Sequence, residues 1–169
     1  GHEPRCRVTL YQGLCKGEKM DFIVQKCTEM GVCAIVPVMM ARSVAKPGKT
    51  EQKTERYSRI AREAVKQCGR SHVPEVRPAL SFAEALEDMR RRQRILMPYE
   101  EGGAPFAQAI AEQDVGLLIG PEGGIAPQEA EAVLRAGGQA VTLGSRILRT
   151  ETAGLVALTL TLHCAGDLT

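Results

Sequence analysis

The 169-residue sequence lacks a strong excess of either charge. Its 22 lysines and arginines face 20 aspartates and glutamates, so the formal net charge at pH 7 is only +2. A large basic excess is the usual whole-chain sign of a nucleic-acid-binding domain, because phosphate groups attract positive charge. The net charge therefore argues neither for nor against a nucleic-acid partner, and local clusters must decide.

Cysteine pairs with metal-site or redox spacing are also missing. The six cysteines form no CxxC pair and no Cys/His group at the spacing of metal ligands. Each lies in an apolar or helical context, where a free cysteine behaves as a small hydrophobic side chain. We therefore expect reduced thiols, no metal and a cytoplasmic location.

Several other signatures are absent. The sequence has no secretory hydrophobic region and no apolar run of membrane-spanning length, from which we expect a soluble protein without membrane contact. It has no GxGxxG fingerprint and no Gly-Lys-Ser/Thr of a Walker loop, which weakens a nucleotide-phosphate interpretation. It also has no internal repeat. At this length, with 44% hydrophobic residues, one well-buried domain is the expectation.

What the sequence does contain is a regular alternation of strand and helix patterns. Short apolar or alternating runs predict strands at residues 7–14, 33–39, 94–98, 115–120 and 139–144. Helical spacing and capping residues predict helices at 20–30, 57–68, 81–92, 105–112, 127–136 and 150–165. Between them, residues 42–50 are predicted to be a loop and residues 70–80 an extended link. The alternation predicts an α/β fold with a mostly parallel sheet flanked by helices.

Two loops at predicted strand ends carry unusual residues. The first is IGPEGG, residues 119–124, where small glycines would let backbone groups approach a ligand. Gly-rich turns of this kind also arise for steric reasons alone. In an open parallel sheet, ligands lie beyond the carboxyl ends of the strands, which is where this loop is expected.

The second loop is LGSRILRTETA, residues 143–153. Thr150 or Thr152 would cap the last helix, and Glu151 suits its positive N-terminal end. Capping leaves Arg146 and Arg149 unexplained, because positive charge at a helix start is mildly unfavourable. An anionic ligand or a developing negative charge would explain these arginines better.

Together, GPEGG and LGSRILRTETA, separated by one helix and one strand, resemble the cofactor-binding core of the SPOUT methyltransferases. The runs KGEKMDFIVQKCTEMGV and IAREAVKQCGRSHVPEVRP resemble the ribosomal RNA small subunit methyltransferase E family in particular. Members of that family methylate N3 of a specific uridine in 16S small-subunit ribosomal RNA. The resemblance covers most of residues 16–167.

The resemblance implies a deep C-terminal trefoil knot, a homodimer whose partner chain completes the active site, and S-adenosylmethionine bound by the loops after three strands. The residues that would bind the cofactor by resemblance are Pro98, Ile119, Gly120, Gly123, Gly124, Leu143, Gly144, Ile147, Leu148 and Thr152. Family members also carry an N-terminal PUA-like barrel. We expect residues 1–15 to hold a tag remnant or linker and the first strand, residues 16–169 to form the methyltransferase domain, and the barrel to lie outside this chain.

The chemistry of the implied reaction suggests roles for charged residues. Methylating uridine N3 requires a base to take its proton and a cation to stabilise the resulting charge. Arginine stays protonated in proteins, so Arg149 is assigned to charge stabilisation. Glu122 and Glu151 are candidate bases, with an ordered water as the rival. Arg42, Arg70 and Arg146 are candidate contacts to ribosomal RNA.

Three alternatives stay open at this point. Another SPOUT enzyme would methylate a ribose 2'-hydroxyl or a guanosine in transfer RNA. A catalytically silent RNA-binding module would keep the same fold without turnover. A nucleotide-binding protein would use residues 119–124 for phosphate, and failure to bind S-adenosylmethionine would favour it.

Overall fold

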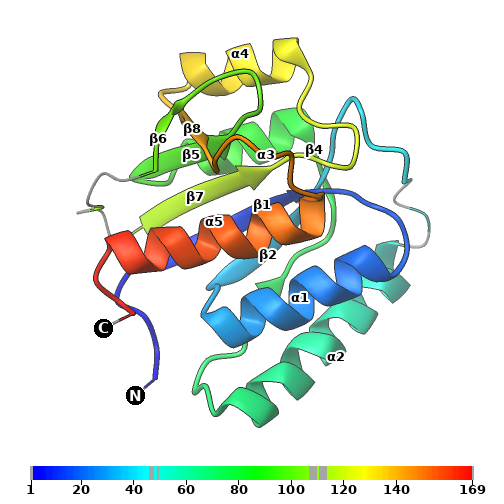
Figure 1. Cartoon of the computed structure of the whole chain (residues 1–169). Helices are drawn as coiled ribbons and strands as arrows, with labels where there is room; N and C mark the ends of the chain where they lie inside the picture. Colours follow the sequence, from blue (N-terminus) through cyan, green and yellow to red (C-terminus); the bar gives the residue numbers. More distant parts are fainter. Residues whose placement is uncertain (1, 46–47, 49, 107–109, 111–113, 169) are drawn as a thin grey trace.

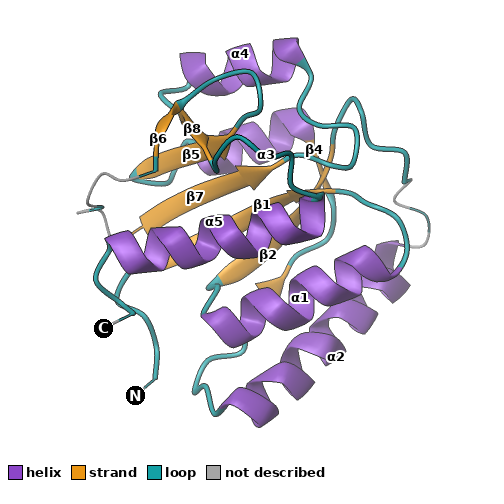
Figure 2. Cartoon of the chain, viewed as in Figure 1, coloured by secondary structure: helices purple, strands orange, loops and turns teal. Residues whose placement is uncertain are grey.

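The computed structural model describes residues 2–45, 48, 50–106, 110 and 114–168. Its centre is a twisted sheet with helices against both faces (Figures 1 and 2). The strands are β1 (Arg7–Gly13), β2 (Ala34–Met39), β3 (Glu75–Val76), β4 (Leu80–Ser81), β5 (Arg94–Pro98), β6 (Ala104–Pro105), β7 (Asp114–Ile119) and β8 (Gln139–Thr142). The helices are α1 (Glu18–Met30), α2 (Thr50–Cys68), α3 (Phe82–Met89), α4 (Pro127–Arg135) and α5 (Thr150–Cys164).

The sheet is parallel at every strand pair that the structure describes. The strand order is β3-β2-β1-β7-β5-β8-β6. Strand β4 also pairs with β2, at Val38 and Met39, whereas β3 pairs with β2 at Ala34 and Ile35. The predicted α/β class with a mostly parallel sheet is therefore confirmed. The threading of the chain into a trefoil knot stays a prediction. Strand β1 lies between β2 and β7 in the sheet. It therefore belongs to the same folded unit as residues 16–168, although the predicted boundary at residue 15 separates them.

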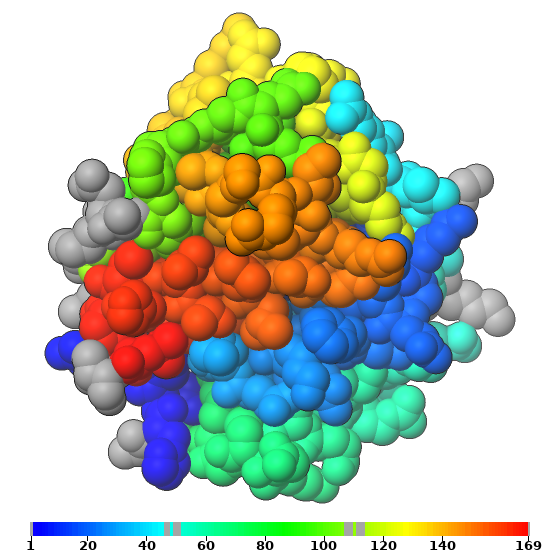
Figure 3. All heavy atoms as spheres, viewed as in Figure 1, coloured from blue at the N-terminus to red at the C-terminus, as the bar shows by residue number. Residues whose placement is uncertain are grey.

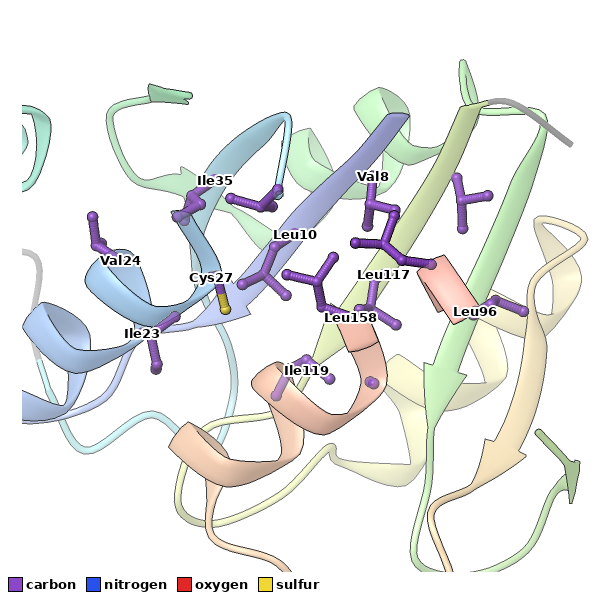
Figure 4. Close-up of a cluster of buried hydrophobic side chains, with 14 of the residues drawn as sticks. Val8, Leu10, Ile23, Val24, Cys27, Ile35, Leu96, Leu117, Ile119 and Leu158 are labelled. Carbon is purple, nitrogen blue, oxygen red and sulfur yellow. The ribbon is translucent and has the colours of Figure 1, made fainter. Parts of the chain in front are cut away.

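Two apolar cores lie on opposite faces of the sheet. The larger one joins inward-facing residues of β1 and β7 to α1 and α5, as Figure 4 shows for Leu10, Leu117, Cys27 and Leu158. The smaller one packs the other side of the same strands against α3 and α4. Strands that are buried on both faces read as nearly continuous apolar runs, which is why the central strands were recognisable in the sequence.

Local signals account for several element ends. Ser81 Oγ accepts the Glu84 N–H at 3.2 Å, while Glu84 Oε1 accepts the Ser81 N–H at 3.0 Å, so the predicted capping box is confirmed. Helix α1 ends at Met30 and is capped by Gly31, whose φ of 115° is accessible to glycine at little cost. Pro127 occupies the first turn of α4, as predicted. Helix α3 stops at Met89, three residues before the predicted end.

One predicted helix is wrong where the structure describes it. Pro105 belongs to β6, which pairs with β8, instead of opening a helix at residues 105–112. Residues 107–109 and 111–113 of that prediction lie outside the described residues. The predicted extended link at 70–80 contains β3 and β4, which extend the sheet beyond β2. Within the described part of the chain, no helix combines the length and apolarity needed to cross a membrane.

Candidate functional site

A cavity of about 400 Å³ opens at the carboxyl ends of β5, β7 and β8. Its walls are the loops at residues 98–101, 119–125 and 142–149, with the first turn of α5 and the side chains of Lys19 and Arg42. Parallel strands bring their carboxyl ends to one edge, so three loops that are distant in sequence meet there. Figure 3 shows the segment near residues 140–150 on the molecular surface, between the loop after β5 and helix α5.

The structure brings most of the predicted site residues together at this cavity. The predicted cofactor residues that line it are Pro98, Ile119, Gly120, Gly123, Gly124, Leu143, Gly144, Ile147 and Leu148. Thr152 is exposed on α5 and does not line it. The charged candidates that line it are Arg42, Glu122, Arg146, Arg149 and Glu151. Sequence reasoning missed Lys19, Tyr99 and the acidic pair at residues 100–101, which also line it.

Glycines shape the loop after β7. A Cβ on Gly120 would lie 2.8 Å from Ile125 Cγ1, closer than atoms can pack. Gly124 has a φ of +81°, and its N–H donates to Pro121 O at 2.9 Å to close a tight turn. The steric interpretation of these two glycines is therefore correct as far as the turn is concerned. The loop therefore turns tightly where it lines the cavity.

Glu122 tethers this loop to the start of α1. Its Oε2 accepts the Lys16 N–H at 2.9 Å and the Lys19 ammonium at 3.3 Å. Burial by itself would raise the pKa of Glu122, but the hydrogen bonds from Lys16 and its own backbone and the Lys19 ammonium outweigh it. The pKa therefore lies below its ordinary value. A carboxylate held in this way is a weaker base and a better anchor.

Arg42 holds the same loop from another side. Its Nη1 donates to Gly123 O at 3.3 Å, and the rest of the side chain is exposed. The buried carboxylate of Glu129 fixes the backbone next to Arg42, because its Oε2 accepts the Ala41 N–H at 2.9 Å and its Oε1 accepts the Ala126 N–H at 3.1 Å. Arg42 therefore lies at the cavity mouth, and among the described residues its guanidinium donates only to Gly123 O.

Thr150 joins the two glycine-containing loops, and the predicted helix cap is wrong. The N-cap residue of α5 is Arg149, and no side chain caps the helix. Thr150 is the first helical residue, and its hydroxyl donates to Gly120 O at 2.6 Å while accepting from Gln12 Nε2 at 2.8 Å. Gln12 is fully buried and was missed in the sequence. The signal for it was one amide side chain near the end of a predicted buried strand.

Arg149 and Glu151 flank Thr150 and face different surroundings. Arg149 is exposed, and none of the described residues pairs with its guanidinium. Glu151 is half-buried, and its Oε1 atom is buried without a hydrogen-bond partner in the described part of the chain. An unpaired buried carboxylate oxygen carries a desolvation cost. Two lining residues of the cavity, two positions apart in sequence, thus carry a guanidinium and a carboxylate oxygen that have no partner among the described residues.

Arg70 does not belong to this site, which corrects its predicted RNA role. Its guanidinium is 4% exposed and forms a two-pronged ion pair with Glu3, with N···O distances of 2.7 and 3.1 Å. Its Nη1 also donates to the carbonyls of Thr28 and Val32. These contacts use the fork to pin the N-terminal segment and the α1–β2 turn. Reaching a phosphate would require breaking them.

The described residues contain no cluster of side chains that could bind a metal ion. No group of three or more His, Cys, Asp or Glu side chains there is arranged to hold an ion. The cavity combines backbone polar groups, arginines and carboxylates. Such a set suits a small organic ligand with a second, anionic partner at its mouth.

Comparisons with known proteins place the chain in a family. The model of the RNA methyltransferase domain family matches residues 2–162. A solved structure of ribosomal RNA small subunit methyltransferase E from Neisseria gonorrhoeae, bound to S-adenosyl methionine, is 36% identical with a TM-score of 0.90. The alignment covers 99% of this chain and 70% of that one. The chain belongs to the ribosomal RNA small subunit methyltransferase E family.

Further matches define how far this membership extends. The ribosomal RNA small subunit methyltransferase E of Bacillus subtilis is 38% identical over 163 residues, which are 90% of this chain and 64% of that protein. The chain thus spans somewhat less than two thirds of that relative's length. A solved RNA 2'-O ribose methyltransferase is 17% identical with a TM-score of 0.64, covering 95% of this chain and 57% of that one. At that identity the likeness shows the shared fold alone.

Proposed function

We propose that this chain is the S-adenosylmethionine-dependent methyltransferase domain of an enzyme that methylates N3 of a uridine in 16S small-subunit ribosomal RNA. The observation that carries the proposal is the cavity built by three strand-end loops in a chain of this family. The Neisseria gonorrhoeae relative is described with S-adenosyl methionine bound, and the Bacillus subtilis relative is named for small-subunit ribosomal RNA. Such a substrate would place the protein in the cytoplasm.

The cavity fits a cofactor of this size and chemistry. Small-molecule sites occupy roughly 300–1,000 Å³, and this cavity of about 400 Å³ lies in that range. When bound, S-adenosylmethionine supplies an electrophilic methyl group on a positively charged sulfonium. The loops at residues 120–124 and 143–148, which line the cavity, would hold it. Orientation of this kind is a large part of catalysis for a transfer between two bound partners.

Between the two candidate bases, Glu151 is the better choice. Glu122 is committed to Lys16 and Lys19, and its pKa is lowered, which weakens it as a proton acceptor. Glu151 keeps one carboxylate oxygen without a partner among the described residues, at the cavity wall. We therefore assign proton removal from uridine N3 to Glu151 and loop anchoring to Glu122.

Arg149 would stabilise the uridine anion. Loss of the N3 proton leaves negative charge on the ring oxygens, and a guanidinium presents a planar fork of donors to neighbouring oxygens. Arg149 lines the cavity, is exposed and lies two positions from Glu151. An unpaired cation at this place is ready for a ligand without first breaking a protein contact.

Arg42 and Arg146 would contact phosphates of the RNA. Both are exposed at the cavity mouth, on the β2–α2 loop and the β8–α5 loop respectively. Phosphate contacts of this kind position an RNA without reading its sequence. Arg70 is left out of the RNA-binding set, because its donors are already used inside the protein.

A homodimer would complete the site. Helix α5 keeps Leu155, Val156 and Leu160 only partly buried, although the helix is apolar on more than one face. Ile147 on the adjoining loop is 80% exposed. An apolar surface next to a cavity is typical of an interaction site. A second copy packed there by a symmetric contact would cover these side chains and add residues to the cavity mouth.

The proposal can be tested in two steps. Calorimetric titration of the purified chain with S-adenosylmethionine, together with its solution mass, should give about one site per chain in a dimer. Methylation of small-subunit ribosomal RNA, followed by nuclease digestion and mass spectrometry of the nucleosides, should place the methyl group on a uracil base. A methyl group on a ribose would instead assign the chain to 2'-O chemistry, and a folded dimer without cofactor binding would contradict the enzyme proposal.

A further inference from the structure

We infer that Gln12 and Thr150 are positioning residues, which form a hydrogen-bonded bridge that fixes the first turn of α5 to the loop after β7. The bridge runs from Gln12 Nε2 to Thr150 Oγ1 at 2.8 Å and from Thr150 Oγ1 to Gly120 O at 2.6 Å. It rests on the proposed function, because the cavity is taken as the cofactor site. Neither residue is assigned a chemical step.

The direction of the bridge follows from its donors and acceptors. Gln12 Nε2 also donates to Gly13 O at 3.0 Å, so both hydrogens of the amide nitrogen are used. A reversed amide would set Gln12 Oε1 against Gly13 O, placing two acceptors face to face. The Thr150 hydroxyl has one hydrogen, and the nitrogen of Gln12 already donates to it. The hydroxyl must therefore donate to Gly120 O.

Burying Gln12 in β1 costs folding free energy, which indicates that the hydrogen bonds donated by its amide have a role. It is fully buried in β1, and its Oε1 has no hydrogen-bond partner within the described ranges. A buried unsatisfied acceptor costs free energy that an apolar side chain of the same shape would not. Gly154 of α5 faces Gln12 where the helix packs against β1, and a Cβ at Gly154 would lie 3.4 Å from Gln12 Oε1. The helix therefore approaches β1 closely at the place where the bridge forms.

The position of Thr150 explains what the bridge would control. Thr150 lies between Arg149 and Glu151, the two residues proposed for chemistry, and its partner Gly120 begins the loop after β7 that lines the cavity. The bond thus sets the distance between the loop that would hold the cofactor and the turn that would act on uridine. A displacement of about 1 Å between such groups is enough to lower a transfer rate by roughly 100-fold.

The test compares Thr150→Val, which keeps the shape and loses the hydroxyl, with Thr150→Ser, which keeps the hydroxyl. We expect the Kd for S-adenosylmethionine to rise about tenfold in the valine variant, equivalent to ~1.4 kcal/mol of binding free energy. The serine variant should stay within about twofold of the unmodified chain. The matched control is Tyr11→Phe, which removes a buried hydroxyl from the other face of β1 and lies outside the cavity. Its Tm should fall while its Kd stays unchanged.

Gln12→Met provides a second variant. It removes the unsatisfied oxygen, which favours folding, and the hydrogen bonds to Gly13 O and Thr150 Oγ1, which opposes it, so we expect a small change in Tm while its Kd for the cofactor rises by a few fold. Equal cofactor affinity in the valine variant and the unmodified chain would overturn the inference. So would an equal loss of affinity in Tyr11→Phe, because affinity would then follow stability alone.

A ligand-free measurement separates this inference from the proposed function. If the unmodified chain binds no S-adenosylmethionine, the proposed function fails, and hydrogen–deuterium exchange of residues 120–125 decides the bridge. Faster exchange there in Thr150→Val, with Tyr11→Phe matching the unmodified chain, would support the bridge. Unchanged exchange in the valine variant would overturn it.

Discussion

Adjacent residues of β1 build two buried polar centres on opposite faces of the sheet. Tyr11 points toward α3, where its hydroxyl donates to Asp88 Oδ2 at 2.6 Å and Arg77 donates to the same oxygen at 3.0 Å. Gln12 points toward α5 and leaves its Oε1 without a partner in the described part of the chain. The first centre connects β1, α3 and the segment after β3 that carries Arg77. The second connects β1 and the first turn of α5 to the loop after β7.

Tyr11, Asp88 and Arg77 form a hydrogen-bonded network, and the charge of Arg92 acts on it although Arg92 Nε is buried without a hydrogen-bond partner among the described residues. Burial, and after it the hydrogen bond to Asp88, raise the pKa of Tyr11 well above its ordinary value, so it stays a neutral donor. Burial would also raise the pKa of Asp88. The hydrogen bonds from Tyr11 and Arg77 and the charges of Arg77 and Arg92 outweigh it, and the pKa of Asp88 lies below its ordinary value. Donors and acceptor stabilise one another.

The difference shows where this protein uses polar burial for stability and where for its site. A satisfied buried network contributes to the free energy of unfolding and specifies one packing. An incompletely satisfied one is tolerated where surrounding structure holds it, and such places are frequently functional. Variants of the Asp88 side should therefore change stability, and variants of the Thr150 side should change the cavity.

The largest expected effect is on turnover. Glu151→Gln removes the proposed base and keeps the side-chain shape, so kcat should fall by roughly 10²–10⁴-fold, the usual contribution of a general base. Its Tm should change little, because Glu151 Oε1 forms no hydrogen bond with the described residues and the loss of a negative charge from the first turn of α5 costs only about 0.3–1 kcal/mol. Steady-state methylation assays with saturating substrates and thermal melts measure the two quantities. Glu122→Gln is the matched control, and an equal loss of kcat in both variants would contradict the choice of Glu151.

Next in size is the cost of opening the Tyr11 centre. Asp88→Ala would leave Arg77 without its carboxylate and the Tyr11 hydroxyl without its acceptor. Removing one partner of a buried pair costs about 3–5 kcal/mol of unfolding free energy. Urea denaturation would measure the loss, and the Kd for S-adenosylmethionine measured under native conditions should not change. A large change of that Kd in a still-folded variant would break the separation of the two faces.

Arg149→Lys sharpens the assignment on the cavity side. The change keeps the positive charge and loses the planar fork of donors, so we expect kcat to fall about 100-fold, or ~2.7 kcal/mol, with little change in cofactor affinity. Steady-state kinetics with saturating RNA separate kcat from the cofactor KM. The assignment would be wrong if affinity fell and turnover held.

Tyr11→Phe should have a smaller effect than Asp88→Ala. The ring stays in place, Arg77 continues to neutralise Asp88, and one hydrogen bond to a charged group is lost, which costs ~2 kcal/mol. Chemical denaturation of the two single variants and the double variant would give the coupling between the residues. Additive losses would mean that Tyr11 and Asp88 act independently, against the network described above.

The smallest expected effect is a dependence of stability on acid pH. Asp88 and Glu122 both have a pKa lowered from values of 3.8 and 4.5 in the unfolded chain. A lowered folded pKa stabilises the protein fully above the unfolded pKa, and that contribution is lost as pH falls through the folded pKa. Unfolding free energy should therefore drop as the pH goes below about 4.5. In Asp88→Asn the drop should be shallower, and an identical pH profile would contradict the role of Asp88.

Much of the fold and part of the site could be predicted from local sequence. The capping box at Ser81, the glycine end of α1 and the buried central strands are short-range patterns, and the structure has them. The loops at 119–124 and 143–153 were recognisable because their composition departs from ordinary strand-helix turns. The helix predicted at 105–112 failed at Pro105, because pairing of β6 with β8 overrides local preference.

Other features depend on contacts that no local pattern encodes. Gln12 and Thr150 lie 138 positions apart, Glu122 and Lys16 lie 106 apart, and Arg70 and Glu3 lie 67 apart. The tertiary structure turned Thr150 from a predicted cap into a bridge, made Arg70 an internal clamp, and separated the role of Glu122 from that of Glu151.

The sequence by itself determined the α/β class, the positions of most elements and the loops that form the cavity, because hydrophobic period and turn chemistry act over a few residues. Only the tertiary structure decided which polar side chains form hydrogen bonds inside the protein and which remain available to a ligand at the cavity. That choice depends on which donor meets which acceptor once distant strands and helices are brought together.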